Sequence, residues 1–111
     1  MRPHAAAIAI VSLAAHSYGF AQNDVPPAPE EEVAKFQAGI EQGCKDQGRR
    51  RGDPPEYVDR FCTCVLNALK ESMSKAEWQR ATALALALRH KESQAVVAPH
   101  VPKAARCKSA A

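Results

Sequence analysis

Four cysteines constrain this chain more than any other feature of its sequence. They are the only cysteines in 111 residues. Two of them stand one residue apart in the run Phe61-Cys62-Thr63-Cys64, with Cys44 upstream and Cys107 near the end. An even number of cysteines in a short exported chain is typical of a disulfide framework. We therefore expect two bridges that hold a small domain together.

The first 21 residues have the pattern of a secretory signal peptide. A basic start precedes an apolar run at residues 5–15, and Gly19-Phe20-Ala21 places small residues at the two positions that a signal peptidase reads. The apolar run is about 11 residues long, whereas a membrane-spanning helix needs about 20. We expect cleavage near Ala21 and a periplasmic or secreted mature chain that begins at Gln22. An uncleaved membrane anchor is the alternative.

The mature chain is short enough for one domain only. Asn23, Asp24 and two prolines make residues 22–28 a flexible lead-in, and residues 29–111 form the expected domain. Across the whole chain 15 basic and 12 acidic residues give a net charge of +3, which indicates solubility and does not define a partner. No second apolar span follows, so no transmembrane segment is expected in the mature chain.

The stretch after the lead-in predicts a helix from Pro29 to Gly48. Pro29 precedes three glutamates at 30–32, and a proline followed by acids is typical of a first helical turn. Gly39 and Gly43 each cost about 1 kcal/mol inside a helix, so we expect a close helix contact there as compensation. Apolar residues spaced by three, four and four positions form the expected buried face. They are Val33, Phe36, Ile40 and Cys44.

A second helix is predicted after the basic loop Arg49-Arg50-Arg51-Gly52. Asp53 is the expected N-cap, Pro54 fits the first helical position, and Glu56 stands where a capping-box acid belongs. The apolar face that follows is broad. It comprises Val58, Phe61, Cys62, Val65, Leu66, Leu69 and Met73.

The run Ser74-Lys75-Ala76-Glu77 is a second capping-box pattern and predicts a third helix from about Lys75 to His90. We expect Ser93 to cap a fourth segment, which Pro99 and Pro102 break into two short pieces. The whole chain is therefore predicted to be all-α, a small three- to four-helix bundle stapled by two disulfides. The apolar face of the third helix comprises Trp78, Ala81, Leu84, Ala85 and Leu88.

Helical geometry limits how the cysteines can pair. Residues two apart on a helix point about 200° away from each other, so Cys62 and Cys64 face different neighbours and do not bond to each other. In an antiparallel hairpin Cys44 lies at about the level of Cys62. We favour Cys44–Cys62 with Cys64–Cys107, and the crossed pairing Cys44–Cys64 with Cys62–Cys107 is the alternative.

The aromatic-Cys-x-Cys motif at 61–64, the upstream Cys44, the Ser-x-x-Glu turn at 74–77 and the last Cys107 are similar to features of small exported proteobacterial proteins of unknown function. The resemblance covers residues 44–107. It implies a disulfide-stapled helical fold outside the cytoplasm and no activity.

Catalytic and metal chemistry find little support in the sequence. A thiol-redox pair would use Cys62 and Cys64 with Arg60 lowering a thiolate pKa, but the spacing is not Cys-x-x-Cys, so structural disulfides are favoured. His90 and His100 stand at no ligand spacing, and we expect surface histidines, no metal site and no cofactor. No nucleophile elbow or phosphate-binding loop is present, so we do not expect an enzyme.

Basic residues supply the remaining candidate site. An anionic envelope component or another exported protein is the expected partner, and the scarcity of aromatic residues among the charges argues against nucleic acid. We therefore expect an exported, non-enzymatic binding or protective protein of undefined oligomeric state. The alternatives are a thiol-redox protein and an acid-stress periplasmic chaperone that loosens at low pH around Phe61 and Trp78. The candidate anion-binding residues are Arg49, Arg50, Arg51 and Arg60, beside Lys45, with a second cluster of Lys103, Arg106 and Lys108.

Overall fold

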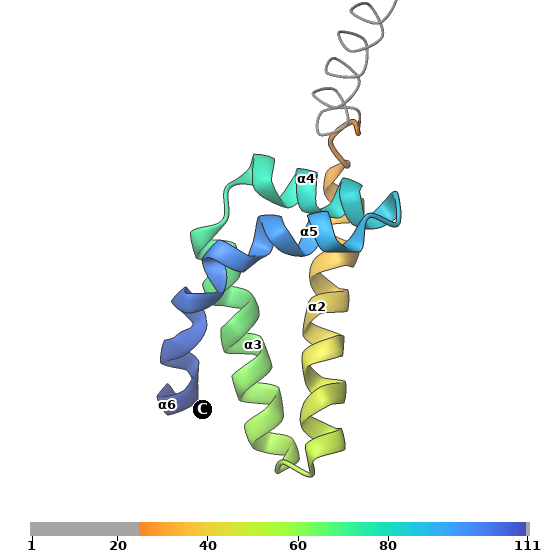
Figure 1. The fold of residues 1–111 in the computed structure, drawn as a ribbon. Coiled ribbons are helices and arrows are strands. Elements are labelled where there is room, and N and C mark those ends of the chain that lie inside the picture. Colours follow the sequence, from red (N-terminus) through yellow and green to blue (C-terminus); the bar gives the residue numbers. More distant parts are fainter. Residues whose placement is uncertain (1–24, 111) are drawn as a thin grey trace, which may run out of the picture.

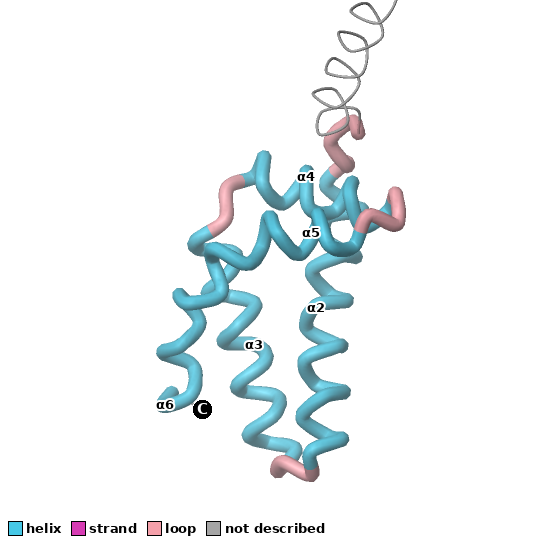
Figure 2. Tube along the Cα trace, viewed as in Figure 1, coloured by secondary structure: helices cyan, strands magenta, loops and turns pink. Residues whose placement is uncertain are grey.

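The computed structural model describes residues 25–110, and every regular element in this range is a helix (Figure 1). Helices α2 and α3 form an antiparallel hairpin, α4 and α5 lie across its open end, and the chain then returns beside α3 (Figures 1 and 2). This is the all-α, disulfide-stapled bundle that the sequence predicts. The elements are α2 (Glu30–Arg51), α3 (Pro55–Ser72), α4 (Lys75–Leu86), α5 (His90–Val97), the 3-10 helix η1 (Ala98–Arg106) and α6 (Cys107–Ala110).

Helix α2 is longer than its sequence predicts. It starts after Pro29, with three glutamates in its first turn, and continues through Gly48 to Arg51. Gly52 ends it, because its φ of 81° lies in the left-handed region and its N–H bonds to the carbonyl of Arg49 at 3.0 Å. The prediction that Gly48 ends the helix is therefore wrong, and Arg49, Arg50 and Arg51 form a last helical turn rather than a loop.

Gly48 has a different role, which is close packing of the hairpin. A Cβ atom added at Gly48 would lie 2.7 Å from one methyl carbon of Val58 and 2.9 Å from the other. The same addition at Gly39 or Gly43 meets no atom within 4 Å. The expectation of a close contact at Gly39 and Gly43 is wrong, and the contact lies at the next glycine along the helix.

Helix α3 begins without the predicted side-chain cap. Its N-cap is Pro54, and no side chain bonds to its free N–H groups. The carboxylate of Asp53 instead accepts a hydrogen bond from Arg51 Nε at 3.2 Å, which closes the turn between the two helices. The prediction of an Asp53 cap fails because Arg51 stands on the last turn of α2, within reach of that carboxylate.

Helix α4 begins as the sequence predicts and ends earlier. The capping box is complete: Ser74 Oγ accepts from the Glu77 N–H at 3.1 Å, and Glu77 Oε1 accepts from the Ser74 N–H at 2.9 Å. The helix stops at Leu86, and the chain turns at Leu88, whose φ is 62°. Leu88 is 78% exposed, so its predicted place on the buried face is wrong.

The predicted fourth segment is present as two helical pieces, but its expected cap is wrong. Ser93 lies inside α5, where it is buried and donates its hydroxyl to the carbonyl of Ala81 at 2.8 Å. The α-helical geometry changes to 3-10 geometry at Ala98, directly before Pro99, and Pro102 lies within η1. Proline lacks the N–H that an α-helix interior needs, which accounts for the change.

The main core lies where the hairpin meets α4. Phe36 packs edge-on against Trp78, with ring centroids 6.3 Å apart and planes at 73°. A smaller cluster joins α3 to the end of the chain through Ala68, Ala104 and Cys107. The buried members of the main core are Leu66, Leu69, Met73, Trp78 and Ala81.

Candidate ligand-binding groove

Two disulfides fix the positions of the helices. Cys44 bonds to Cys62 with their Cα atoms 5.8 Å apart, and Cys64 bonds to Cys107 with a Cα separation of 5.7 Å. This is the favoured pairing of the sequence analysis. The first bridge joins the two helices of the hairpin, and the second attaches the end of the chain to α3. None of the cysteines in the described range is free, so Cys62 and Cys64 do not form a thiol pair.

The C-terminal arm, residues 90–110 (α5, η1 and α6), is tied to the rest of the molecule along its length. Ser93 bonds to Ala81, as described above, and the Cys64–Cys107 bridge holds the far end. Arg106 Nη2 also pairs with Glu71 Oε2 at 3.0 Å on the surface of α3. These ties set the space that remains between the arm and the hairpin.

His100 provides another tie near the middle of the arm. Its Nδ1 lies 2.7 Å from Ser72 Oγ, its Nε2 lies 2.8 Å from Glu77 Oε2, and its side chain is 15% exposed. The expectation of a surface histidine is therefore wrong for His100, although His90 is exposed. A hydrogen bond from the Ser74 backbone and a second from His100 lower the pKa of the Glu77 carboxyl below its usual value.

The order serine, histidine, carboxylate also occurs in hydrolase triads. A triad needs, in addition, a space in which a substrate reaches the serine. The three cavities described below are lined by neither Ser72 nor His100. Glu77 Oε1 is meanwhile committed to the cap of α4. We interpret these three side chains as a structural tie between the arm and the α3–α4 turn.

An apolar groove lies between the C-terminal arm and the hairpin. Its volume is about 530 Å³, and residues of α2, α3, α4, α5 and η1 contribute to its walls. Phe36 and Val65 are only half-buried, and Val101 is 54% exposed. The apolar side chains that form its walls include Phe36, Ile40, Val65, Leu69, Val97 and Val101.

Polar groups in the groove come from α5 alone. His90, Ser93 and Gln94 line it, and they share one face of that helix because they are three and four positions apart. Sequence periodicity identified the apolar faces of α2 and α3 but not the groove, because those faces were expected to be covered by helix packing. The position of the arm, which leaves them partly open, has no signal in the sequence.

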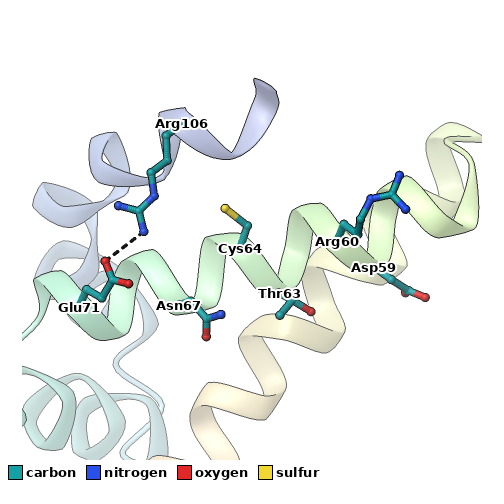
Figure 3. A pocket seen from close by; sticks show the side chains of 7 residues that line it. All are labelled: Asp59, Arg60, Thr63, Cys64, Asn67, Glu71 and Arg106. Carbon is teal, nitrogen blue, oxygen red and sulfur yellow. Dashed lines mark hydrogen bonds and ion pairs between the residues drawn. The ribbon is translucent and has the colours of Figure 1, made fainter. Parts of the chain in front are cut away.

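A second cavity, also about 530 Å³ but more open and lined mainly by charged and polar residues, lies over the outer face of α3 (Figure 3). Both acidic and basic side chains line it, and Arg106 extends from the arm to pair with Glu71 (Figure 3). A third cavity of about 370 Å³ lies beside Trp78, with Glu30 and Lys75 among its lining residues. The second cavity contains equal numbers of acidic and basic side chains, and the Lys75–Glu30 ion pair leaves Lys70 as the remaining charged residue in the lining of the third. The residues lining the second cavity are Asp59, Arg60, Thr63, Cys64, Asn67, Glu71 and Arg106.

The structure separates the arginines that were expected to bind an anionic partner. Arg49, Arg50 and Arg51 lie on the last turn of α2, whereas Arg60 lines the polar cavity on α3. Arg49 pairs with Asp46 at 3.3 Å, and Arg51 pairs with the Asp53 carboxylate at 3.2 Å. Paired carboxylates reduce the positive potential of this surface. Binding of an anionic partner here stays a prediction.

No family model, curated protein or solved structure matches this chain. Among the helices of residues 25–110, none is long and apolar enough to cross a bilayer. The same range contains no cluster of three or more side chains of the kinds that ligate metals.

Proposed function

We propose that this chain is an exported, non-enzymatic binding protein that holds an apolar ligand in the groove between its C-terminal arm and its helical hairpin. The observation that carries the proposal is the groove itself. Ligand sites are mostly apolar clefts of about 300–1,000 Å³ with a few polar groups that orient the ligand. The groove matches that description, with a volume of about 530 Å³ and polar groups from a single helix.

Export is supported by the disulfides and by the first residues of the chain. Two bridges persist in an oxidising compartment and are rare in the cytosol. Residues 1–21 have the composition of a signal peptide, and they lie outside the described range. We propose a periplasmic or secreted location. The motif around Phe61-Cys62-Thr63-Cys64, which resembles that of small exported proteobacterial proteins, agrees with it.

Binding in the groove is tested with the neutral fluorophore N-phenyl-1-naphthylamine, whose emission rises in apolar surroundings. Wild-type protein should bind it saturably. Ala98 lines the groove and Ala105 does not, and both are exposed residues of η1. Ala98→Trp should fill the groove and abolish most of the signal, and the matched control Ala105→Trp should bind as wild type does.

Circular dichroism of each variant confirms that the helices are retained. If the wild-type protein does not bind the fluorophore saturably, the proposal is rejected. Equal binding by the Ala98→Trp and Ala105→Trp variants would place the fluorophore outside the groove and would also reject it.

A second candidate function is an acid-stress chaperone, and the tie through His100 favours it. Glu77 has a lowered pKa, and its carboxylate holds both the cap of α4 and the arm. Protonation of Glu77 in strong acid removes the charge from both contacts. The arm then loosens and exposes the apolar walls of the groove to unfolded clients. This candidate uses the same surface but only at low pH, whereas the main proposal requires binding at neutral pH.

A further inference from the structure

We propose that the groove takes a single-chain amphiphile with an anionic head group, held with its head at the N-terminal end of α5 and its chain along the hairpin. The inference rests on the proposed function and names the chemical class of its ligand. Three features carry it: the polar side chains on the first turns of α5, the absence of acids from the walls of the groove and the uncapped start of α5.

The polar side chains of the groove stand on the first turns of α5, and the rest of its lining is apolar. His90 and Gln94 stand on successive turns at the start of α5, whereas Val65 and Val101 belong to α3 and η1. Ser93 is already committed to the Ala81 carbonyl. His90 and Gln94 are exposed, and within residues 25–110 their side chains form no hydrogen bond or ion pair. Their donor groups are therefore available to the polar end of a ligand.

Charge favours an anion at the start of α5. No aspartate or glutamate lines the groove, and His90 is the one ionisable side chain in its walls. Glu92, the acid of the first turn of α5, pairs with Arg89 instead. Lys91, the next residue along α5, is exposed and carries a positive charge, and the His90 imidazole can donate a hydrogen bond. A carboxylate or phosphate head placed here meets a hydrogen-bond donor and a positive neighbour, whereas a cationic head meets like charge.

The backbone of α5 adds to this preference. Its N-cap is Arg89, which makes no side-chain capping bond. The first intrahelical bond runs from the Ser93 N–H to the Arg89 carbonyl at 3.0 Å, so the three preceding N–H groups have no helical acceptor. The positive end of the helix dipole lies at the same place. The free N–H groups and the helix dipole therefore favour an anionic head group, as the side chains do.

The apolar walls of the groove suit an alkyl chain. Phe36, Ile40 and Val97 provide aliphatic and aromatic walls that remain partly open to water. Each methylene group removed from water there contributes about 0.8 kcal/mol. A flexible single chain can follow walls supplied by separate helices. A second copy of this protein is the competing occupant, and the experiment below separates the two.

The test compares three ligands that share a twelve-carbon chain and differ in the head: dodecanoate, dodecan-1-ol and dodecyltrimethylammonium. The two ionic ligands are titrated below their micelle concentrations, and dodecan-1-ol below its solubility limit, against protein loaded with the neutral fluorophore. Dodecanoate should displace the fluorophore with an affinity about tenfold higher than that of the cation, which corresponds to about 1.4 kcal/mol.

Two variants locate the head group. His90→Glu places an acid at the start of α5, and Ala95→Glu adds the same charge to an exposed position of α5 that does not line the groove. The ratio of dodecanoate affinity to dodecan-1-ol affinity should fall about tenfold in His90→Glu, because the introduced carboxylate repels the carboxylate head group. It should stay at the wild-type value in Ala95→Glu.

The outcomes separate the two proposals. Equal affinity for dodecanoate and dodecyltrimethylammonium, or an equal change in both variants, overturns the anionic head group and leaves the groove as a binding site. Failure of the fluorophore and of all three ligands to bind overturns the proposed function as well. A dimer in light scattering that excludes the fluorophore assigns the groove to a second copy and rejects the amphiphile.

Discussion

At the scale of single residues, the contact between Gly48 and Val58 sets how closely the two helices of the hairpin approach. Val58 is 3% exposed, and its two methyl groups occupy the space that a side chain at position 48 would need. The Cys44–Cys62 bridge lies one turn away on each helix and requires the same close approach. The hairpin therefore depends on a missing side chain as well as on a covalent bond.

Gly48→Ala should lower the free energy of unfolding by about 1–3 kcal/mol, because the added methyl group overpacks the contact with Val58. The higher helix propensity of alanine should offset about 1 kcal/mol of this loss. Gly43→Ala is the matched control on the same helix, where an added Cβ meets nothing within 4 Å. It should gain about 0.5–1 kcal/mol from helix propensity alone. Urea unfolding followed by circular dichroism gives both values.

Changing Val58 to alanine in the Gly48→Ala background should restore part of the loss, because it removes the two methyl groups that clash. If Gly48→Ala and Gly43→Ala shift the unfolding curve in the same direction, the close contact has no energetic role.

At the scale of helices and their ends, the sequence predicted starts better than stops. The capping box at Ser74 and Glu77 was predicted because two local side chains define it. Asp53 and Glu56 form the same capping pattern, but the Asp53 carboxylate accepts a hydrogen bond from Arg51 instead. The end of α4 was missed because Leu88 adopts a left-handed conformation that glycine or asparagine adopts more readily. Both cases are decided by neighbouring residues that the capping patterns do not take into account: Arg51 stands two positions before Asp53, and backbone bonds to Leu84 and Ala85 close the turn at Leu88.

The tie of His100 to Ser72 and Glu77 predicts how stability responds to acid. The pKa of Glu77 is lower in the folded state than its usual value of 4.5, so the folded state binds fewer protons than the unfolded state does. The ionised Glu77 carboxylate therefore contributes to the stability of the folded state above pH 4.5, and this contribution is lost as the pH falls through the lowered folded pKa. Glu77→Gln retains a capping side chain but does not titrate.

Urea unfolding at pH 7, 5, 4 and 3 should show a smaller loss of stability for Glu77→Gln than for the wild type over the acid part of this range. Binding of an apolar dye at pH 3 reports whether the arm opens, as the chaperone candidate requires. Parallel loss of stability in both proteins would show that Glu77 does not control the acid response, and compact protein without dye binding would count against the chaperone.

At the scale of the whole molecule, apolar spacing and helix-start patterns predicted the all-α class, and the diverging directions of Cys62 and Cys64 predicted that each bonds to a separate partner. The expected level of Cys44 beside Cys62 in the hairpin favoured the observed pairing over the crossed one. The groove was not predictable in the same way. It depends on the angle at which α5 and η1 leave α4, and that angle follows from the turn at Leu88, the Ser93–Ala81 bond and the His100 tie together. No local pattern encodes a combination of distant contacts.

The two bridges should contribute unequally to stability. They separate residues by 18 and 43 positions, for which loop-closure entropy predicts about 3 and about 4 kcal/mol. Small domains have a net stability of only about 5–15 kcal/mol. Replacing Cys64 and Cys107 with serine should therefore destabilise the protein more than replacing Cys44 and Cys62, and it should also release the arm and weaken fluorophore binding.

Thermal unfolding of the two double variants, with thiol titration of the wild type to confirm that no cysteine is free, measures the difference. A greater loss on removing the Cys44–Cys62 bridge would mean that strain or residual structure, rather than loop length, sets the contribution of each bridge.

The bridges join the first cysteine to the second and the third to the fourth, so their loops follow one another along the chain and do not overlap. A polypeptide that crosses a membrane N-terminus first, as we propose for this one, presents Cys62 before Cys64 and both before Cys107. Oxidation in order of emergence then gives the native linkage directly. Consecutive pairing of this kind therefore requires less rearrangement of wrong pairs during maturation than a crossed pairing would.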